Sequence, residues 1–303
     1  MQHLRKLEDI TAADVQAILK LTAELKQQHK TKTRPAKLQG HVLTMVFEKP
    51  SLRTRNSFEA AMINLGGSGV FLSCKEAGLD GREDLADIAK VLSGYSDVVV
   101  LRTFSQKLID DFAELASCPV INGLSDDRHP CQALADLFTI QESFGDVENR
   151  HLVYIGDGNN VAASLVKISA MMNLRVTVCT PKGYEMEAAV LDEIKQQHPT
   201  SEILTTTNPQ EAVSNADVIY TDVWASMGQE AEAEARKKIF QPFQINASLM
   251  SAAPANCQFM HCLPAHRGEE VAAEVIDGSQ SIVFQQAENR MHLARGLFAW
   301  LLE

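Results

Sequence analysis

The sequence predicts an α/β protein made of two doubly wound parallel-sheet domains. Three observations support this prediction. Short apolar runs alternate with segments of helical spacing, which is typical of parallel sheets covered by helices on both faces. The alternation restarts after a polar stretch at residues 145–150. The chain of 303 residues is also long enough for two domains that each bury a full core.

Start and stop signals define most of the elements expected in the first half. Thr11 and Asp14 have the character of a capping box before a helix. An apolar strand at 42–47 precedes a helix that begins at Ser51 and ends at the two glycines 66–67. Further strands are expected at 70–72, 97–102 and 120–121, with helices around 85–92 and 108–115 between them.

The second half repeats this pattern. A helix opens after His129 and leads to the polar stretch, so the two halves meet within residues 133–150. The elements expected beyond it are a strand at 152–155, a loop at 156–160, a helix at 161–172, strands at 176–179, 218–220 and 259–260, and a final amphipathic helix at 289–302.

Composition and charge exclude several classes of protein. The net charge of −11 argues against nucleic acid or an anionic membrane as the main partner, so an anionic ligand would need a local cluster of cations. Six cysteines show no CxxC pair and no regular spacing, which indicates free thiols in a reducing compartment. No signal-peptide pattern and no membrane-spanning apolar run is present. We therefore expect a soluble, cytoplasmic protein.

In doubly wound sheets, ligands bind at the carboxyl ends of strands, so the residues after each strand are candidate site residues. The stretch Ser51-Leu52-Arg53-Thr54-Arg55 begins a helix with two hydroxyls and two guanidinium groups. A helix N-terminus attracts anions and disfavours cations, so two arginines there suggest a bound phosphate or similar anion. For these five residues alone, a capped helix with solvated arginines is slightly favoured.

Other strand ends also carry polar side chains. Arg102 ends an apolar strand, and His129 opens a helix with Gln132 one turn on; together they suit a carbonyl or phosphoryl oxygen. Alone, His129 is more often a cap or core residue. Asp222 suits a cationic ligand group and precedes Ser226-Met227-Gly228, a candidate lid. A helix-capping loop is the favoured interpretation of that segment taken alone.

The loop Gly156-Asp157-Gly158-Asn159-Asn160 begins like a dinucleotide-binding fingerprint. It lacks the third glycine and the acidic residue after the next strand, so we reject that interpretation. Its two asparagines suit a zwitterionic or amide ligand, and an Asn-rich turn with a cap explains them about equally well.

His261-Cys262-Leu263-Pro264 follows another apolar strand and places a thiol beside a histidine and near Arg267. Such surroundings could lower the pKa of Cys262. The spacing that a zinc site requires is missing, and a buried structural cysteine is the usual alternative for a lone cysteine. Arg290, at the start of the final helix, could reach an anion only if that helix packs back against the first half.

Taken together and in this order, these motifs closely resemble the carbamoyltransferase family. The resemblance covers almost the whole chain, and the Ser226-Met227-Gly228 and His261-to-Pro264 segments are similar to those of its ornithine branch. It implies transfer of a carbamoyl group from carbamoyl phosphate to the side-chain amine of L-ornithine, which gives L-citrulline and phosphate in arginine biosynthesis or in ornithine and citrulline metabolism. It implies no metal and no organic cofactor.

The resemblance also assigns domains and residues. A carbamoyl-phosphate domain would comprise 1–133 and 286–303, since the final helix returns to it, and an ornithine domain 134–285; the unit would be a homotrimer or a multiple of trimers. The residues expected to bind carbamoyl phosphate are Ser51, Leu52, Arg53, Thr54, Arg102, His129, Gln132, Cys262, Leu263 and Arg290. Those expected to bind ornithine are Asn160, Asp222, Ser226 and Met227, and the catalytic residues are Arg102, His129, Asp222 and Cys262.

Two positions depart from the family pattern. Leu52 stands where the family usually has threonine, a form more common in enzymes for acetylornithine and succinylornithine, and it can contribute only its backbone. The loop position near Gly78 lacks the polar residue that reaches a neighbouring subunit. The alternatives are therefore a carbamoyltransferase for a modified ornithine or putrescine, a non-catalytic homologue that binds carbamoyl phosphate, and, least supported, a nicotinamide-dependent oxidoreductase.

Overall fold

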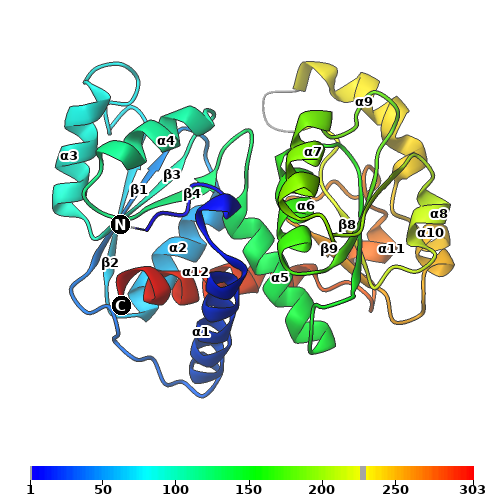
Figure 1. Ribbon diagram of the computed structural model, residues 1–303, viewed down its shortest axis with the longest axis horizontal. Coiled ribbons are helices and arrows are strands. Elements are labelled where there is room, and N and C mark those ends of the chain that lie inside the picture. Colours follow the sequence, from blue (N-terminus) through cyan, green and yellow to red (C-terminus); the bar gives the residue numbers. More distant parts are fainter. Residues whose placement is uncertain (1, 226–229) are drawn as a thin grey trace. The chain divides into compact units, whose positions relative to one another are not determined.

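The computed structural model describes residues 2–225 and 230–303, and the chain divides into two compact units. Unit 1 consists of Met1–Phe138 and Glu288–Glu303, and unit 2 of Thr139–Ala287. Each unit is a parallel sheet with helices on both faces (Figure 1). This arrangement confirms the predicted fold class, including the return of the C-terminal helix to the first unit. The unit borders follow residues 138 and 287, whereas the sequence placed them after 133 and 285.

The sheet of unit 1 has four parallel strands in the order β2-β1-β3-β4. Its strands are β1 (Val42–Phe47), β2 (Ser68–Ser73), β3 (Val98–Arg102) and β4 (Val120–Leu124). Every residue of β3 is buried, as expected for a central strand covered on both faces. The helices of this part of the chain are α1 (Ala12–Lys30), α2 (Leu52–Asn64), α3 (Leu85–Tyr95), α4 (Gln106–Leu115), α5 (Pro130–Phe144) and α12 (Val283–Leu302).

Local signals set the helix ends in unit 1. The Thr11 side chain accepts from the Asp14 N–H and the Asp14 carboxylate accepts from the Thr11 N–H, which forms the predicted capping box. Beyond the end of α2, Gly66 adopts a φ of +90°, a conformation that favours glycine. The final helix begins at Val283, six residues before the expected start at 289, because apolar Val283 belongs to its first turn and packs into the core of unit 2.

Helices α3 and α4 cover one face of the unit 1 sheet, where Ile88 and Phe112 pack on Val99 and Leu101. Helices α2, α12 and α1 lie on the other face (Figure 1). There Phe58 of α2 meets Phe298 of α12, with ring centroids 5.8 Å apart. This second layer brings the C-terminal helix beside the first turn of α2.

The sheet of unit 2 has five parallel strands in the order β7-β6-β5-β8-β9. They are β5 (His151–Ile155), β6 (Arg175–Cys179), β7 (Ile203–Thr206), β8 (Val218–Thr221) and β9 (Gln258–His261). The helices are α6 (Asn160–Met171), α7 (Ala188–Gln197), α8 (Pro209–Val213), α9 (Ala233–Phe240), α10 (Ala247–Ala252) and α11 (Ala273–Ile276). One core cluster joins β5, β8 and β9 to α8, α10 and α11.

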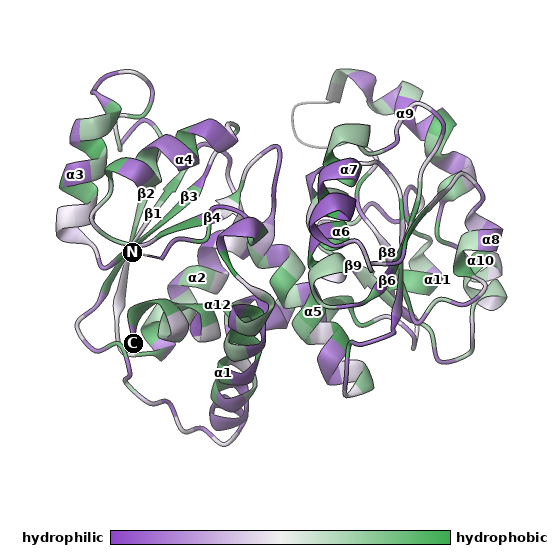
Figure 2. Ribbon diagram, viewed as in Figure 1, coloured by the Kyte–Doolittle hydropathy of each residue, from purple (hydrophilic) through white to green (hydrophobic). Residues whose placement is uncertain are grey.

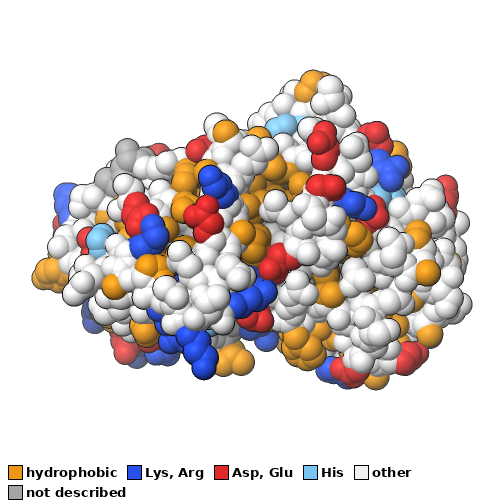
Figure 3. Space-filling model, turned by 90° about the horizontal axis from the view of Figure 1, so that it is seen from below, with side chains coloured by type: hydrophobic (Ala, Val, Ile, Leu, Met, Phe, Trp, Pro, Cys, Tyr) orange, Lys and Arg blue, Asp and Glu red, His pale blue; other side chains and the backbone are white. Residues whose placement is uncertain are grey.

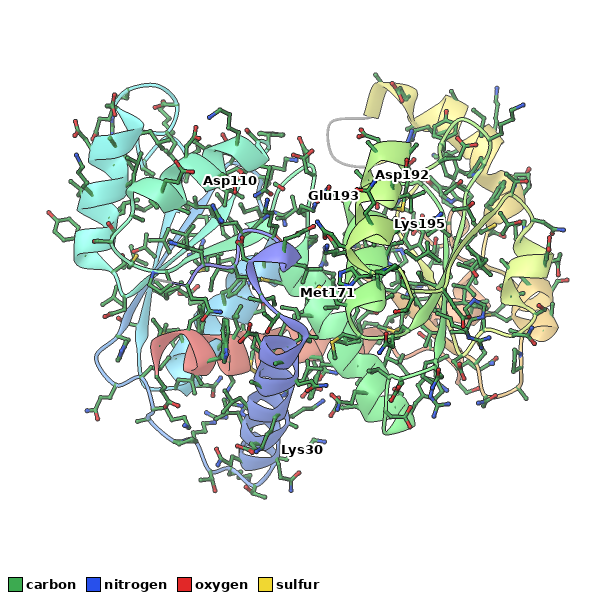
Figure 4. The ribbon with its side chains drawn as sticks, viewed as in Figure 1. Lys30, Asp110, Met171, Asp192, Glu193 and Lys195 are labelled. Carbon is green, nitrogen blue, oxygen red and sulfur yellow. The ribbon has the colours of Figure 1, made fainter. Side chains whose placement is uncertain are left out.

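Hydrophobic residues are mostly buried and charged residues mostly exposed, as the alternation of apolar and polar residues in the sequence predicts. The strands are mostly hydrophobic and the helices are mixed (Figure 2). On α7, Asp192, Glu193 and Lys195 are exposed (Figure 4) while Ile194 is buried. Basic and acidic side chains are interspersed on the face shown in Figure 3. Within the described residues, no helix has both the length and the apolar character to cross a membrane.

The packing of α12 on α1 requires a glycine at position 296. A Cβ atom there would lie 2.1 Å from the Thr22 hydroxyl and 2.8 Å from the Thr22 nitrogen. We therefore expect Gly296→Ala to lower the free energy of unfolding by about 1–3 kcal/mol, although alanine favours helices. Gly94→Ala in α3, where nothing lies within 4 Å, is the control and should raise it by up to about 1 kcal/mol. Urea unfolding of both variants measures these changes, and a stabilised Gly296→Ala would contradict the packing.

Candidate functional site

The strand order defines one switch point in each sheet. In unit 1 the chain goes from β1 to β2 on one side and then crosses to β3 on the other, and in unit 2 the strands β5 and β8 stand in the same relation. Ligands bind at the carboxyl ends of such strands. The segment from Ser51 follows β1 and Arg102 ends β3, whereas the loop 156–160 follows β5 and Asp222 follows β8. The predicted strand-end residues therefore lie at the two switch points.

In unit 1, the hydroxyl of Thr54 joins three parts of the chain. Ser51 is the N-cap of α2, and its Oγ accepts from the Thr54 N–H at 3.1 Å and lies 3.0 Å from Thr54 Oγ1. The same Thr54 oxygen accepts from Arg102 Nη1 at 3.3 Å and from Arg290 Nη2 at 3.0 Å. Thr54 is fully buried and each of the two arginines is 7% exposed. The structure thus unites residues that are 236 positions apart in sequence.

The electrostatics of this cluster are unfavourable without a ligand. Burial, and after it the positive charges of Arg290 and Arg53, lower the pKa of Arg102 to about 10. Burial, with Arg290 and Arg102, also lowers the pKa of His129 well below its usual value. His129 is therefore a neutral imidazole at neutral pH. Arg102 and Arg290 are buried and Arg53 is half-buried, and a bound anion would offset the unfavourable burial and repulsion of these positive charges.

Two buried atoms in unit 1 add to this requirement. Among the described residues, Arg102 Nε and Gln132 Oε1 have no hydrogen-bond partner, although both are buried. The amide nitrogen of Gln132 donates to Asp136 Oδ1 at 2.8 Å, which fixes the amide with its oxygen available. A buried donor and a buried acceptor without partners are costly unless a ligand satisfies them.

The five-residue stretch divides into residues that join the cluster and residues that do not. The side chain of Leu52 is 74% exposed, so only its backbone can serve a ligand at the helix start. Arg55 Nε lies 3.5 Å from Glu59 Oε2, and its guanidinium stacks on the Phe71 ring at 4.0 Å. Arg55 therefore has a structural contact on the outside of α2, and Ser51, Arg53 and Thr54 are left as the candidate ligand residues.

In unit 2, the buried carboxylate of Asp222 organises the switch point. Its Oδ2 accepts from Asn159 Nδ2 at 2.9 Å, and its Oδ1 accepts from the Val223 N–H at 2.8 Å. The Cys262 thiol donates to the same Oδ1 at 3.0 Å. Asp222 and Cys262 are thus brought together as expected.

Asn159 was not among the predicted site residues. Its Oδ1 caps α6 by accepting from the Val161 and Ala162 N–H groups, and its amide donates to Asp222. Asn160, which the sequence favoured, is the first residue of α6. The cap interpretation of the asparagine pair therefore holds for Asn159, and its position just before the helix was the signal.

The backbone after β9 is fixed by His261. Its Nδ1 accepts from the Leu263 N–H at 2.8 Å, and its Nε2 lies 3.2 Å from Glu270 Oε1, so the ring carries its proton on Nε2. Leu263 has a φ of +58°, in the left-handed region. The Arg267 side chain, expected near the thiol, binds Asp277 instead.

Asp222, His261 and Cys262 offer three metal-ligand atoms within 4.8 Å of one another. Both ring nitrogens of His261 are already engaged, one with the Leu263 N–H and the other with Glu270. The cluster therefore offers a carboxylate and a thiol, which suit a cationic group of an organic ligand at least as well as a metal ion.

A buried ion pair between Arg236 and Asp157 helps to hold the backbone just after Asp222. Arg236 binds the Asp157 carboxylate and donates from Nε to the Trp224 carbonyl at 2.6 Å. Burial raises the pKa of Asp157, while Arg236 acts in the opposite direction. Sequence reasoning missed this pair, because Arg236 lies in an ordinary charged helix. Ser226 and Met227, which were expected to bind ornithine, lie outside the described residues.

The geometry defines a two-unit α/β protein with a cationic anion site in one unit and a polar, partly anionic site in the other. Residues 2–142 match the carbamoyl-P binding domain, and residues 148–301 the Asp/Orn binding domain, of the aspartate/ornithine carbamoyltransferase family. The chain belongs to this family.

Individual relatives and solved structures support membership of the same family. The chain is 50% identical over 307 residues to ornithine carbamoyltransferase from Bacillus subtilis, covering 99% of this chain and 94% of the relative. It is 48% identical over 298 residues to the Anoxybacillus flavithermus enzyme of that name, covering 98% and 95%. The structure of ornithine carbamoyltransferase from Pyrococcus furiosus superposes with a TM-score of 0.96 at 46% identity, covering 99% of this chain and 97% of that one.

The lowered pKa of His129 predicts a pH dependence of stability in the ligand-free protein. Below the unfolded pKa of about 6.5 the unfolded chain takes up a proton that folded His129 does not, so stability falls as pH falls. Relative to His129→Gln, the wild type should lose up to about 1.4 kcal/mol per pH unit below pH 6.5. Urea unfolding from pH 7.5 to 5 measures this difference. A difference that stays constant over this range would contradict a buried, neutral His129.

Proposed function

We propose that this chain transfers the carbamoyl group of carbamoyl phosphate to the side-chain amine of L-ornithine, giving L-citrulline and phosphate. The observation that carries the proposal is the buried cluster in which Arg102 and Arg290 donate to the Thr54 hydroxyl at the N-terminus of α2. It has the charge and the donors that the phosphate group of an acyl phosphate requires. The relatives' shared name, ornithine carbamoyltransferase, supports the same substrate pair.

We propose that the first turn of α2 binds the phosphate. The donors there are the hydroxyls of Ser51 and Thr54, the Arg53 guanidinium and the backbone N–H of Leu52. The carbamoyl end would be held by Arg102, His129, Gln132 and Arg290, with Cys262 and the Leu263 carbonyl helping. Gln132 Oε1, buried without a partner among the described residues, suits the carbamoyl NH₂, which is a donor.

For ornithine, we propose Asn160, Asp222, Ser226 and Met227 at the amino-acid end. Asp222 is buried and ties together Asn159 and Cys262, so its carboxylate has a fixed position for an ammonium group. Cys262 would lie beside the reacting amine. A fixed anion beside a thiol suits recognition of an α-amino group and orientation of the side-chain nitrogen.

The chemistry follows from these roles. An ammonium group with a pKa of roughly 10 is not a nucleophile, so ornithine must react as the neutral amine. Its nitrogen forms a bond to the carbamoyl carbon, the C–O bond to phosphate breaks, and the proton lost from nitrogen leaves with the phosphate. The carbonyl oxygen becomes negative in the tetrahedral state, and Arg102 and neutral His129 would donate to it. Loss of one such donor typically costs about 2.7–4 kcal/mol in the barrier.

Assembly and compartment are further proposals. The family resemblance supports a homotrimer or a multiple of trimers. All six cysteines lie among the described residues and all are free thiols, which favours a reducing compartment such as the cytoplasm.

The second candidate is a carbamoyltransferase for acetylornithine, succinylornithine or putrescine. Leu52 favours the two acylated substrates, because the family resemblance associates this residue with enzymes for acetylornithine and succinylornithine. Its side chain is largely exposed and gives no hydroxyl to the helix start. Asp222 weighs against the acylated substrates, because an acylated α-amine carries no positive charge for that carboxylate.

One assay separates these candidates. Formation of the ureido product from carbamoyl phosphate is measured in parallel with ornithine, acetylornithine, putrescine and aspartate. We expect ornithine to be preferred by at least about tenfold in kcat/KM, because loss of a charged contact costs 1.4 kcal/mol or more. A preference for acetylornithine or putrescine would contradict the substrate assignment. Undetectable turnover together with tight binding of carbamoyl phosphate would instead indicate a non-catalytic homologue.

A further inference from the structure

The chain between β9 and α11 of unit 2 (Figure 1) contains His266, Glu269 and Glu270. His266 Nδ1 lies 4.0 Å from Glu269 Oε2 and 3.8 Å from Glu270 Oε2. The three ligand atoms all lie within 4.8 Å of one another. None of these three residues is among those assigned to the two substrates.

The turn is held rigidly by contacts on several sides. Its backbone closes through the Glu269 N–H, which donates to the His266 carbonyl at 2.9 Å, and Gly268 supplies the φ of +92° that the turn needs. The Gln244 amide donates to the carbonyls of Gly268 and Glu269 at 3.0 and 2.8 Å. These contacts fix the backbone from which the three side chains project.

Glu270 gives the second, independent observation. Its side chain is fully buried, and its Oε1 lies 3.2 Å from His261 Nε2 and accepts from the His266 N–H. Its Oε2 is also buried and, in the part of the chain that the structure describes, has no hydrogen-bond partner. This is the oxygen that faces His266 Nδ1. A buried carboxylate oxygen without a partner is costly unless a cation or a donor reaches it.

The cluster of His266, Glu269 and Glu270 is accessible to solvent through the side chains of His266 and Glu269. His266 is 53% and Glu269 is 33% exposed at the side chain, so an ion can enter from solvent. Lys237 Nζ binds the other oxygen of Glu269, Oε1, at 3.0 Å. That contact neutralises part of the charge and leaves Oε2 turned toward the imidazole.

We propose that His266, Glu269 and Glu270 bind a divalent transition-metal cation of the zinc type. Imidazole nitrogen and carboxylate oxygen are both zinc ligands, and three protein ligands leave the fourth tetrahedral position to water. Metal–ligand bonds of about 2.1 Å require ligand atoms about 3.4 Å apart. The two spacings from His266 Nδ1, 4.0 and 3.8 Å, would therefore contract by about 0.5 Å, and the carboxylate oxygens would close from a spacing that lies within 4.8 Å. The cation gives Glu270 Oε2 its missing partner.

Titration of the full chain with zinc chloride tests the proposal. Calorimetry and thermal unfolding are carried out on the metal-free wild type and on His266→Gln, Glu269→Gln and Glu274→Gln. Glu274 is an exposed carboxylate in α11, so Glu274→Gln is the matched control for loss of one surface charge. Glu270 is left intact, because its contacts with His261 and the turn also serve the fold.

The wild type should bind at this site with an affinity that each of His266→Gln and Glu269→Gln lowers by tenfold or more, and Glu274→Gln should leave it unchanged. Absence of zinc binding in the wild type, or equal binding by all variants, overturns the proposal. Cobalt(II) locates the ion, because a thiolate ligand gives a sulfur-to-cobalt charge-transfer band. A cobalt complex without that band, lost in His266→Gln, supports the site, and a band that persists places the ion at Cys262 and overturns it.

Discussion

The hydroxyl of Thr54 is the interaction on which the unit 1 site depends. It receives guanidinium donors from the end of β3 and from the C-terminal helix, at the point where Ser51 caps α2. Two cations are thereby held, almost fully buried, beside a third arginine and a neutral histidine. Such an arrangement costs stability in the free protein, and it is preorganised to hold an anion in one orientation.

Unit 2 also places polar side chains at the switch point of a parallel sheet, but the charge of these side chains is the opposite of that in unit 1. Both sheets place their site at the point where the strand order reverses, so one set of backbone rules positions both groups of side chains. In unit 1 the strand ends present guanidinium groups. In unit 2 they present the carboxylate of Asp222, supported by Asn159 and by the Cys262 thiol. This division agrees with one anionic and one partly cationic substrate.

Many features of the fold and of the candidate site are predictable from residues that lie close together in the sequence. The end of β3 at Arg102, the Ser51 cap and the capping box at Thr11 depend on residues close in sequence, and the structure has them where expected. The missed features depend on tertiary contacts. Arg236 reaches Asp157 across 79 positions, and Glu270 reaches back to the His261 ring that supports Leu263. The early start of α12 was missed because its first residue, Val283, packs in the core of unit 2, which is a tertiary contact.

Arg102 is held in a buried position that suits a bound anion, and its burial lowers the free energy of unfolding of the ligand-free protein. Urea unfolding of the wild type and of Arg102→Met, with and without inorganic phosphate at constant ionic strength, tests it most directly. Replacing a buried, repelled cation by an apolar side chain should raise the free energy of unfolding by about 1–4 kcal/mol without phosphate. Phosphate should then stabilise the wild type more than the variant, because the charge of Arg102 adds to the donors of the first turn of α2. A variant that is less stable than the wild type without phosphate and gains as much from phosphate would contradict this account.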